Sequence, residues 1–136
     1  MKSPFTAAGI CPDGGVYHEE RIGFDVGVPG IVVDRLPDFC GCGCGLPISP
    51  SHAGMWPLTH VRSGYVICWA LDPESATAIA HTLAHLDWTV AADVILADAT
   101  YRASIRAAVE QFGGRLGGAA GATSSSYPPV DLAVQP

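Results

Sequence analysis

Three cysteines, Cys40, Cys42 and Cys44, alternate with glycines in residues 38–49, which read DFCGCGCGLPIS. Cysteine binds metals as the thiolate, and glycine lets the backbone bend so that two sulfur atoms approach one ion. Structural zinc takes four ligands, usually cysteine and histidine. Cys40 and Cys44 have the usual ligand spacing, whereas the neighbouring pairs are closer than usual. The segment therefore predicts a site for zinc or another soft metal.

Three cysteines leave a fourth ligand to find, and we expect His52 because it follows the cysteines most closely. The other candidates are His60, His18, Cys11 and the pair His81/His85. The pair is four residues apart on a predicted helix, a spacing that metal sites use. At about 100° per residue, however, the pair lies opposite the apolar residues Ile79 and Leu83. The predicted metal ligands are therefore Cys40, Cys42, Cys44 and His52.

Other interpretations of the cysteine segment remain open. Glycine and cysteine are small, and a thiol packs as a small hydrophobic group, so the loop could be a tight turn without metal. Redox chemistry or an iron–sulfur cluster is a further alternative, and a cluster would recruit Cys11 or Cys68 as the fourth ligand. Cys68 is expected in the core instead, because it shares a strand face with Val66 and Ala70.

Motifs for catalysis are weak. Cysteine and histidine are both present, but no local signature pairs a nucleophile with a base. The glycines of residues 113–118 follow a predicted helix and precede none, so they lack the strand-to-helix context of a phosphate-binding loop. Trp56, Trp69 and Trp88 are more simply explained as core or interface anchors than as a ligand cage. We therefore expect no catalytic residues.

Composition narrows the classes of partner. The 136 residues form one domain, and 49% of them are hydrophobic while only 15% are charged, below the usual quarter or so. Such a surface predicts a protein partner or self-association. A net charge of −6 without a basic cluster argues against nucleic acid, and no apolar run reaches the ~20 residues of a membrane-spanning helix.

Cysteine usage and the first residues bear on the compartment. Five cysteines, three of them crowded together, make a poor disulfide framework. Residues 1–15 contain no continuous apolar segment of the secretory kind. We expect a cytoplasmic protein with reduced thiols.

We expect residues 1–15 to form an N-terminal arm. Patterns typical of strands come after it. Residues 22–28 alternate apolar and polar or small side chains, which predicts a half-buried strand with Ile22, Phe24, Val26 and Val28 on its covered face. Pro29-Gly30 suits a turn or corner before a second strand over residues 31–36. Residues 47–63 contain three prolines and are expected as an irregular connection. Residues 64–71 are apolar on both faces, typical of a central strand.

Helices are predicted over residues 73–86, 89–96 and 100–112. The first has Asp72 as its cap, Pro73 in its first turn and an apolar stripe through Leu83. Thr89 and Thr100 are expected to cap the other two, and Gly113-Gly114 to end the last. Residues 113–126 have the composition of a flexible spacer, and Tyr127, Val130, Leu132 and Val134 make the end of the tail apolar.

These elements predict an α+β domain over residues 16–112, in which a hairpin and a central strand pack against two or three C-terminal helices, with flexible arms over residues 1–15 and 113–136. The expected function is that of a non-enzymatic binding or accessory protein, acting through protein–protein contacts and stabilised by a metal in the Cys40–Cys44 loop. A structural subunit of a larger assembly, such as a viral particle or an enzyme complex, is one alternative, and a thiol-based metal-handling or redox protein is another.

Overall fold

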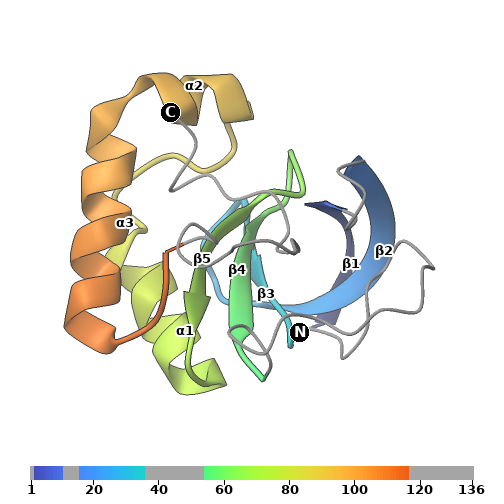
Figure 1. Cartoon of the computed structure of the whole chain (residues 1–136), viewed down its shortest axis with the longest axis horizontal. Coiled ribbons are helices and arrows are strands. Elements are labelled where there is room, and N and C mark those ends of the chain that lie inside the picture. The colour runs from blue at the N-terminus through green and yellow to red at the C-terminus, as the bar shows by residue number, and fades with distance from the viewer. Residues whose placement is uncertain (1, 11–15, 36–53, 117–136) are drawn as a thin grey trace.

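A curled antiparallel sheet with helices on its outer face is the architecture of the described residues, which are 2–10, 16–35 and 54–116 of a computed structural model. The strands are β1 (Lys2–Ile10), β2 (Val16–Asp25), β3 (Ile31–Val33), β4 (Trp56–His60) and β5 (Val66–Ala70), and they neighbour one another in that order. The helices are α1 (Pro73–Thr82), α2 (Ala92–Ala97) and α3 (Ala99–Phe112). Helix α1 packs on β3, β4 and β5, and α3 packs on α1 and β5 (Figure 1). The α+β class expected from the sequence is confirmed.

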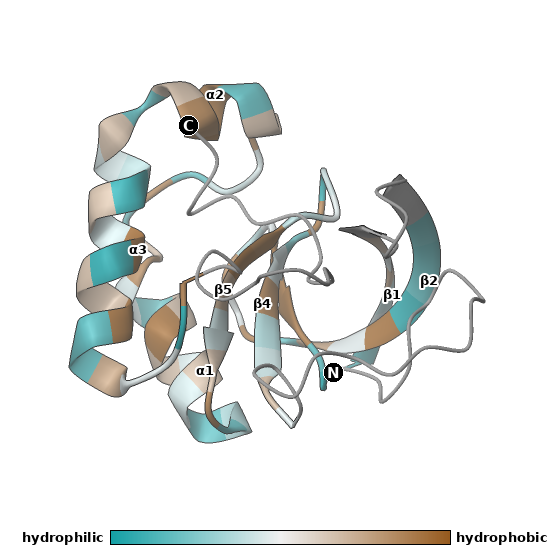
Figure 2. Cartoon of the chain, viewed as in Figure 1, coloured by the Kyte–Doolittle hydropathy of each residue, from teal (hydrophilic) through white to brown (hydrophobic). Residues whose placement is uncertain are grey.

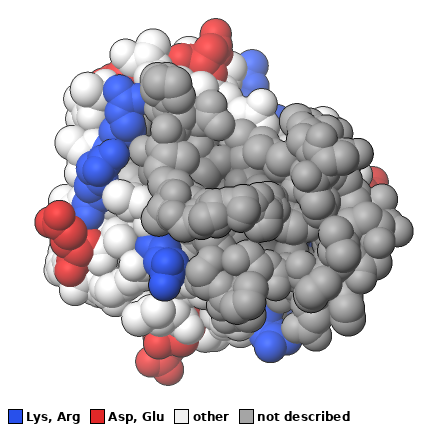
Figure 3. Space-filling view, in the orientation of Figure 1, with Lys and Arg blue, Asp and Glu red and all other residues white. Residues whose placement is uncertain are grey.

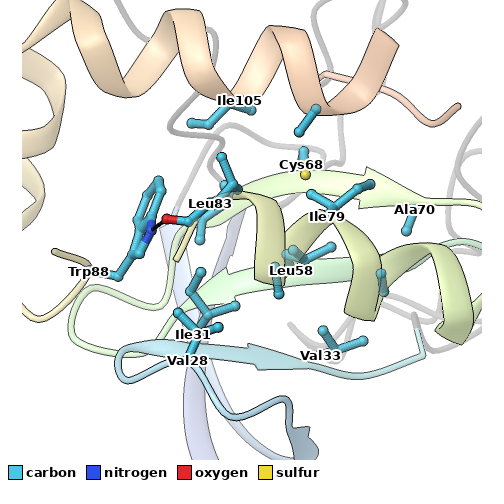
Figure 4. Packing of buried hydrophobic residues seen from close by; sticks show 14 of the residues in the cluster. Val28, Ile31, Val33, Leu58, Cys68, Ala70, Ile79, Leu83, Trp88 and Ile105 are labelled. Carbon is cyan, nitrogen blue, oxygen red and sulfur yellow. Dashed lines mark hydrogen bonds between the residues drawn. The ribbon is translucent and has the colours of Figure 1, made fainter. Parts of the chain in front are cut away.

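The main core lies between the helices and strands β3–β5. Ile79 and Leu83 are fully buried there, and Leu58 of β4 and Ile105 of α3 approach them from either side (Figure 4). Trp88 closes one end of this core, and its indole N–H donates to the carbonyl oxygen of Leu83 at 2.9 Å. The helical stripe predicted from the sequence is therefore the contact surface of α1.

Helix α1 begins as predicted. The Asp72 side chain accepts a hydrogen bond from the Ser75 N–H at 2.7 Å, and Pro73 occupies the first turn, where its missing N–H is not needed. The helix ends at Thr82, and only turn-type hydrogen bonds continue to Leu86, so the predicted end at residue 86 was too late.

The starts of the other two helices differ from prediction. Helix α2 begins after Ala91, because Thr89 is engaged with the side chain of Asp87 instead of capping a helix. Helix α3 is capped by Asp98, whose carboxylate accepts from the Thr100 N–H at 2.9 Å. Gly113, with φ of 75°, ends α3 as predicted.

Strand β1 occupies most of the range that was expected as an arm, residues 1–15. It pairs with β2 in the register from Lys2↔Phe24 to Ile10↔Val16, so a distant strand supplies the hydrogen bonds that local sequence does not reveal. The sheet also curls until the Ala8 N–H donates to the Gly64 carbonyl at 2.9 Å. A Cβ at Gly64 would lie 2.5 Å from the Thr6 carbonyl oxygen, so this approach requires glycine.

The remaining strands correct three predictions made from the sequence. Strand β3 stops at Val33, short of the predicted residue 36, and β4 forms within the connection that was expected to be irregular. Strand β5 is completely buried, but it is last in the sheet order instead of central. Its outer edge meets Arg115, which exchanges backbone hydrogen bonds of 2.9 and 2.8 Å with Trp69. The first residues of the predicted tail therefore continue the sheet.

Candidate functional site

The predicted metal ligands Cys40, Cys42, Cys44 and His52 all lie outside the described residues, as does the alternative Cys11. The zinc site therefore stays a prediction. Cys68 is buried in the main core, as expected. In the ranges 2–10, 16–35 and 54–116, no group of three or more metal-binding side chains comes together.

The described histidines outside the core do not assemble into a site. His18 is exposed on β2. His81 and His85 are exposed as predicted, but each is engaged separately: the His81 Nε2–H donates to the Val26 carbonyl at 2.9 Å, and the His85 Nδ1–H donates to the Thr82 carbonyl at 3.0 Å. His81 therefore links α1 to the segment after β2, and His85 links the turn after α1 to the end of that helix.

The exposed His85 also places Nε2 3.5 Å from the Ser104 hydroxyl oxygen, but the closer contact with a serine hydroxyl is made by the buried His60. Its Nδ1 lies 2.6 Å from the Ser63 hydroxyl oxygen, and its Nε2–H donates to the Val90 carbonyl at 2.9 Å. Burial lowers the pKa of His60 below its ordinary 6.5, so the ring is neutral and Nδ1 accepts from the Ser63 O–H. A hydroxyl that donates to an imidazole also occurs in nucleophilic catalysis.

Other contacts identify the His60–Ser63 pair as part of a turn. The Ser63 oxygen also accepts the Tyr65 N–H at 3.1 Å, and the His60 carbonyl accepts the Gly64 N–H at 2.8 Å. Neither His60 nor Ser63 lines the groove described below. This arrangement closes the β4–β5 turn and anchors it to the segment before α2.

A charged group lies on the sheet face opposite the helices. Arg21 of β2 places Nε 3.2 Å from Asp34 Oδ2 and Nη1 3.4 Å from Glu19 Oε1, with its guanidinium 5.7 Å from the centre of the Phe5 ring. Asp34 is only 4% exposed. Because Glu19 and Arg21 alternate with the outward residues of β2, strand periodicity places both side chains on this inner face.

The energetics of this ionic group are unusual, because burial outweighs the ion pair. Desolvation raises the pKa of Asp34 from 3.8 to about 6, against the Arg21 charge, which lowers it. In the described part of the chain, buried side-chain atoms without a hydrogen bond of good geometry gather on this same face: Glu19 Oε1, Arg21 Nε and Nη2, Asp34 Oδ1 and Thr59 Oγ1. A buried charge with incomplete hydrogen bonding lowers stability.

An apolar groove lies on the outer surface, where α1 meets the sheet. We define the groove by its lining residues, Phe24, Asp25, Val26, Val33, Trp56, Pro73, Thr77 and His81, which enclose a volume of about 420 Å³. The rings of Phe24 and Trp56 are 6.4 Å apart and tilted by 39°. Lys2 lies 5.7 Å from the centre of the Phe24 ring. The groove therefore has an aromatic floor, with one wall formed by α1.

The sheet surface beside the groove is apolar and uncovered. Helix α1 covers β3–β5, and the hairpin of β1 and β2 curls away from it, which leaves a hydrophobic part of β2 without a helix above it (Figure 2). Ile22 is 65% exposed and Phe24 41% exposed, although the alternation in residues 22–28 was predicted to turn both inward. Strand β2 ends at Asp25, and beyond it Val26 and Val28 pack on the main core as predicted. The prediction was wrong for Ile22 and Phe24, because the inner face of β2 carries Arg21 and Gly23.

Charge on the described surface is dispersed. In the view of Figure 3, Lys and Arg side chains form a short row at the left edge, other charged side chains are scattered, and no broad patch of one sign covers the described part. Among the described residues, no helix is both long and apolar enough to cross a membrane. No known protein family, curated protein or solved structure matches this chain.

Proposed function

We propose that this chain is a non-enzymatic binding protein that holds an apolar, extended segment of a partner protein in the groove. The observation that carries the proposal is the groove of about 420 Å³ with the Phe24 and Trp56 rings in its floor, beside the uncovered Ile22. Contiguous exposed apolar surface of this kind marks interaction sites, whereas isolated exposed residues do not.

The lining chemistry favours binding over catalysis. His81 uses its Nε2–H on the Val26 carbonyl, and Asp25 accepts the Gly27 N–H at 2.8 Å. The two ionisable groups among the described lining residues are therefore engaged with the backbone. Aromatic-lined grooves bind extended and proline-containing segments, because such segments lose little conformational entropy on binding.

Selection of peptides on the full chain tests this function. A random 12-residue peptide library is panned on the wild-type protein, and binders are compared on Phe24→Asp and on the control Val94→Asp. Val94 lies on α2, outside the groove lining, and is 47% exposed, so both changes add one charge at a partly exposed site.

The expected result is enrichment of apolar, proline-containing peptides that bind the wild type and Val94→Asp equally and lose at least tenfold in affinity on Phe24→Asp. Tenfold corresponds to about 1.4 kcal/mol, a modest loss for a charge placed in an apolar contact. Failure to enrich any sequence, or equal binding to all three proteins, would reject the proposal.

A further inference from the structure

We propose that the occupant of the groove in the isolated protein is the C-terminal segment of the same chain, residues 127–134. This inference rests on the proposed function, because it names which segment the groove holds. The segment reads YPPVDLAV, and its apolar residues are Tyr127, Val130, Leu132 and Val134. A proline pair favours extended backbone, and alternating apolar residues place one side of an extended chain against a surface.

The end of the described chain brings this segment within reach. Arg115 pairs with Trp69 of β5, and Trp69 pairs with Pro57 of β4, next to Trp56 in the groove floor. Across the sheet, Trp56 of β4 is two strand spacings from Arg115, or about 10 Å, and Phe24 of β2 on the far side of the groove is four spacings away, or about 19 Å.

Residues 117–126 lie between that end and the segment, and they read GGAAGATSSS, the composition of a spacer. Ten residues span up to ~33 Å when extended and about 17 Å on average for a glycine-rich chain. The extended length exceeds both separations and the average length lies between them, so the spacer can pass around the end of the sheet to the groove.

Tethering favours the chain's own segment over a second copy. A short tether gives an effective concentration in the millimolar range, far above the concentration of other copies in a dilute solution. If the free segment binds the groove with a Kd near 0.1 mM, an effective concentration of about 1 mM fills the groove roughly nine-tenths of the time. A partner must then displace the segment, and its apparent affinity falls about tenfold.

The test compares NMR spectra of the full chain with those of Val130→Asp/Leu132→Asp. The control is Ser124→Asp/Ser126→Asp, which adds the same charge within the spacer sequence. The expected result is a shift of amide and indole signals at Val26, Val33 and Trp56 in the first variant only, independent of protein concentration between about 20 and 500 µM.

A synthetic peptide of residues 127–136 provides the second readout. The Val130→Asp/Leu132→Asp variant should bind it about tenfold more tightly than the wild type does, and Phe24→Asp should not bind it. Groove signals that are unchanged in the Val130→Asp/Leu132→Asp variant would overturn the inference. Shifts that depend on protein concentration would also overturn it, because they would indicate a second copy as the occupant. Library peptides that bind the groove in a protein with unchanged groove signals would leave the proposed function standing, whereas the absence of any Phe24-dependent peptide would remove both.

Discussion

The pKa of Asp34 predicts an inverse dependence of stability on pH. Burial raises this pKa from 3.8 to about 6, so between these pH values the folded protein keeps a proton that the unfolded chain releases. The contribution of Asp34 to stability is therefore fully present below about pH 4 and is lost as pH rises through 6. At roughly 1.4 kcal/mol per pKa unit, the loss is on the order of 3 kcal/mol.

Urea unfolding of wild type and Asp34→Asn from pH 4 to pH 8 measures this effect, with tryptophan fluorescence as the signal. Asparagine does not ionise, so a constant cost of the substitution cancels when values at different pH are compared. Between pH 4 and pH 7.5 the free energy of unfolding of the wild type should fall, relative to that of Asp34→Asn, by about 2 kcal/mol of the full ~3 kcal/mol. A difference that is the same at every pH would refute the assignment of Asp34 as a buried, destabilised charge.

Substitution of the two charged neighbours of Asp34 separates the causes of its pKa shift. Arg21 lowers the pKa of Asp34 and Glu19 raises it, so Arg21→Met should move the pKa above 6 and Glu19→Gln should move it below. A carboxyl-carbon NMR titration of Asp34 reads both directions. Asp72→Asn is a control of opposite sign, because hydrogen bonds from Ser75 lower the pKa of Asp72, and its contribution to stability is lost as pH falls.

The remaining predictions concern stability and metal content. Leu83→Ala should lower the free energy of unfolding by about 2–5 kcal/mol, while exposed His85→Ala should change it by less than about 0.5 kcal/mol, as measured by urea unfolding; equal losses would contradict the assigned faces of the α1 segment. Gly27→Ala should lower the free energy of unfolding by ~1–2 kcal/mol, because Gly27 has a positive φ. Gly30→Ala should lower it well beyond that, because Gly30 also has a positive φ and a Cβ at that position would collide with the backbone of Trp88. Similar melting temperatures of the two variants would contradict this packing. If the cysteine loop binds zinc, purified protein should contain about one ion per chain, and Cys40→Ser should lower both metal content and melting temperature; metal-free wild type would end the zinc prediction.

Local patterns predicted that three helices follow the sheet, and they predicted the start and the buried face of α1. Asp72, Pro73 and the stripe through Leu83 lie within one segment of the chain, and their meaning depends on neighbours three or four residues away. The exposure of His81 and His85 followed from the same period. These features needed no knowledge of distant residues.

Long-range pairing explains what could not be predicted. Strand β1 is stabilised by its register with β2, and residues 1–15 alone carry no strong strand pattern. The alternation in β2 indicated a strand, but only the position of α1 decides that Ile22 and Phe24 remain uncovered. No local signal marks Asp34 as buried, because its ion-pair partner Arg21 comes from β2, a distant part of the chain.

The groove itself combines residues from β2, β3, β4 and α1, so no sequence motif could have revealed it. Its one sequence signal was the tryptophan set, in which Trp56 was expected as a core or interface anchor. The fold places Trp56 partly buried, against the core and in the groove floor.

Chemical-shift mapping of the full chain with a library-selected peptide is the most direct test of the proposed binding function. We expect the largest changes on the Trp56 indole and on the Val26 and Val33 methyl groups, and we expect them to disappear in Phe24→Asp. Largest changes on α2 or α3, or changes that persist in Phe24→Asp, would contradict the proposed function.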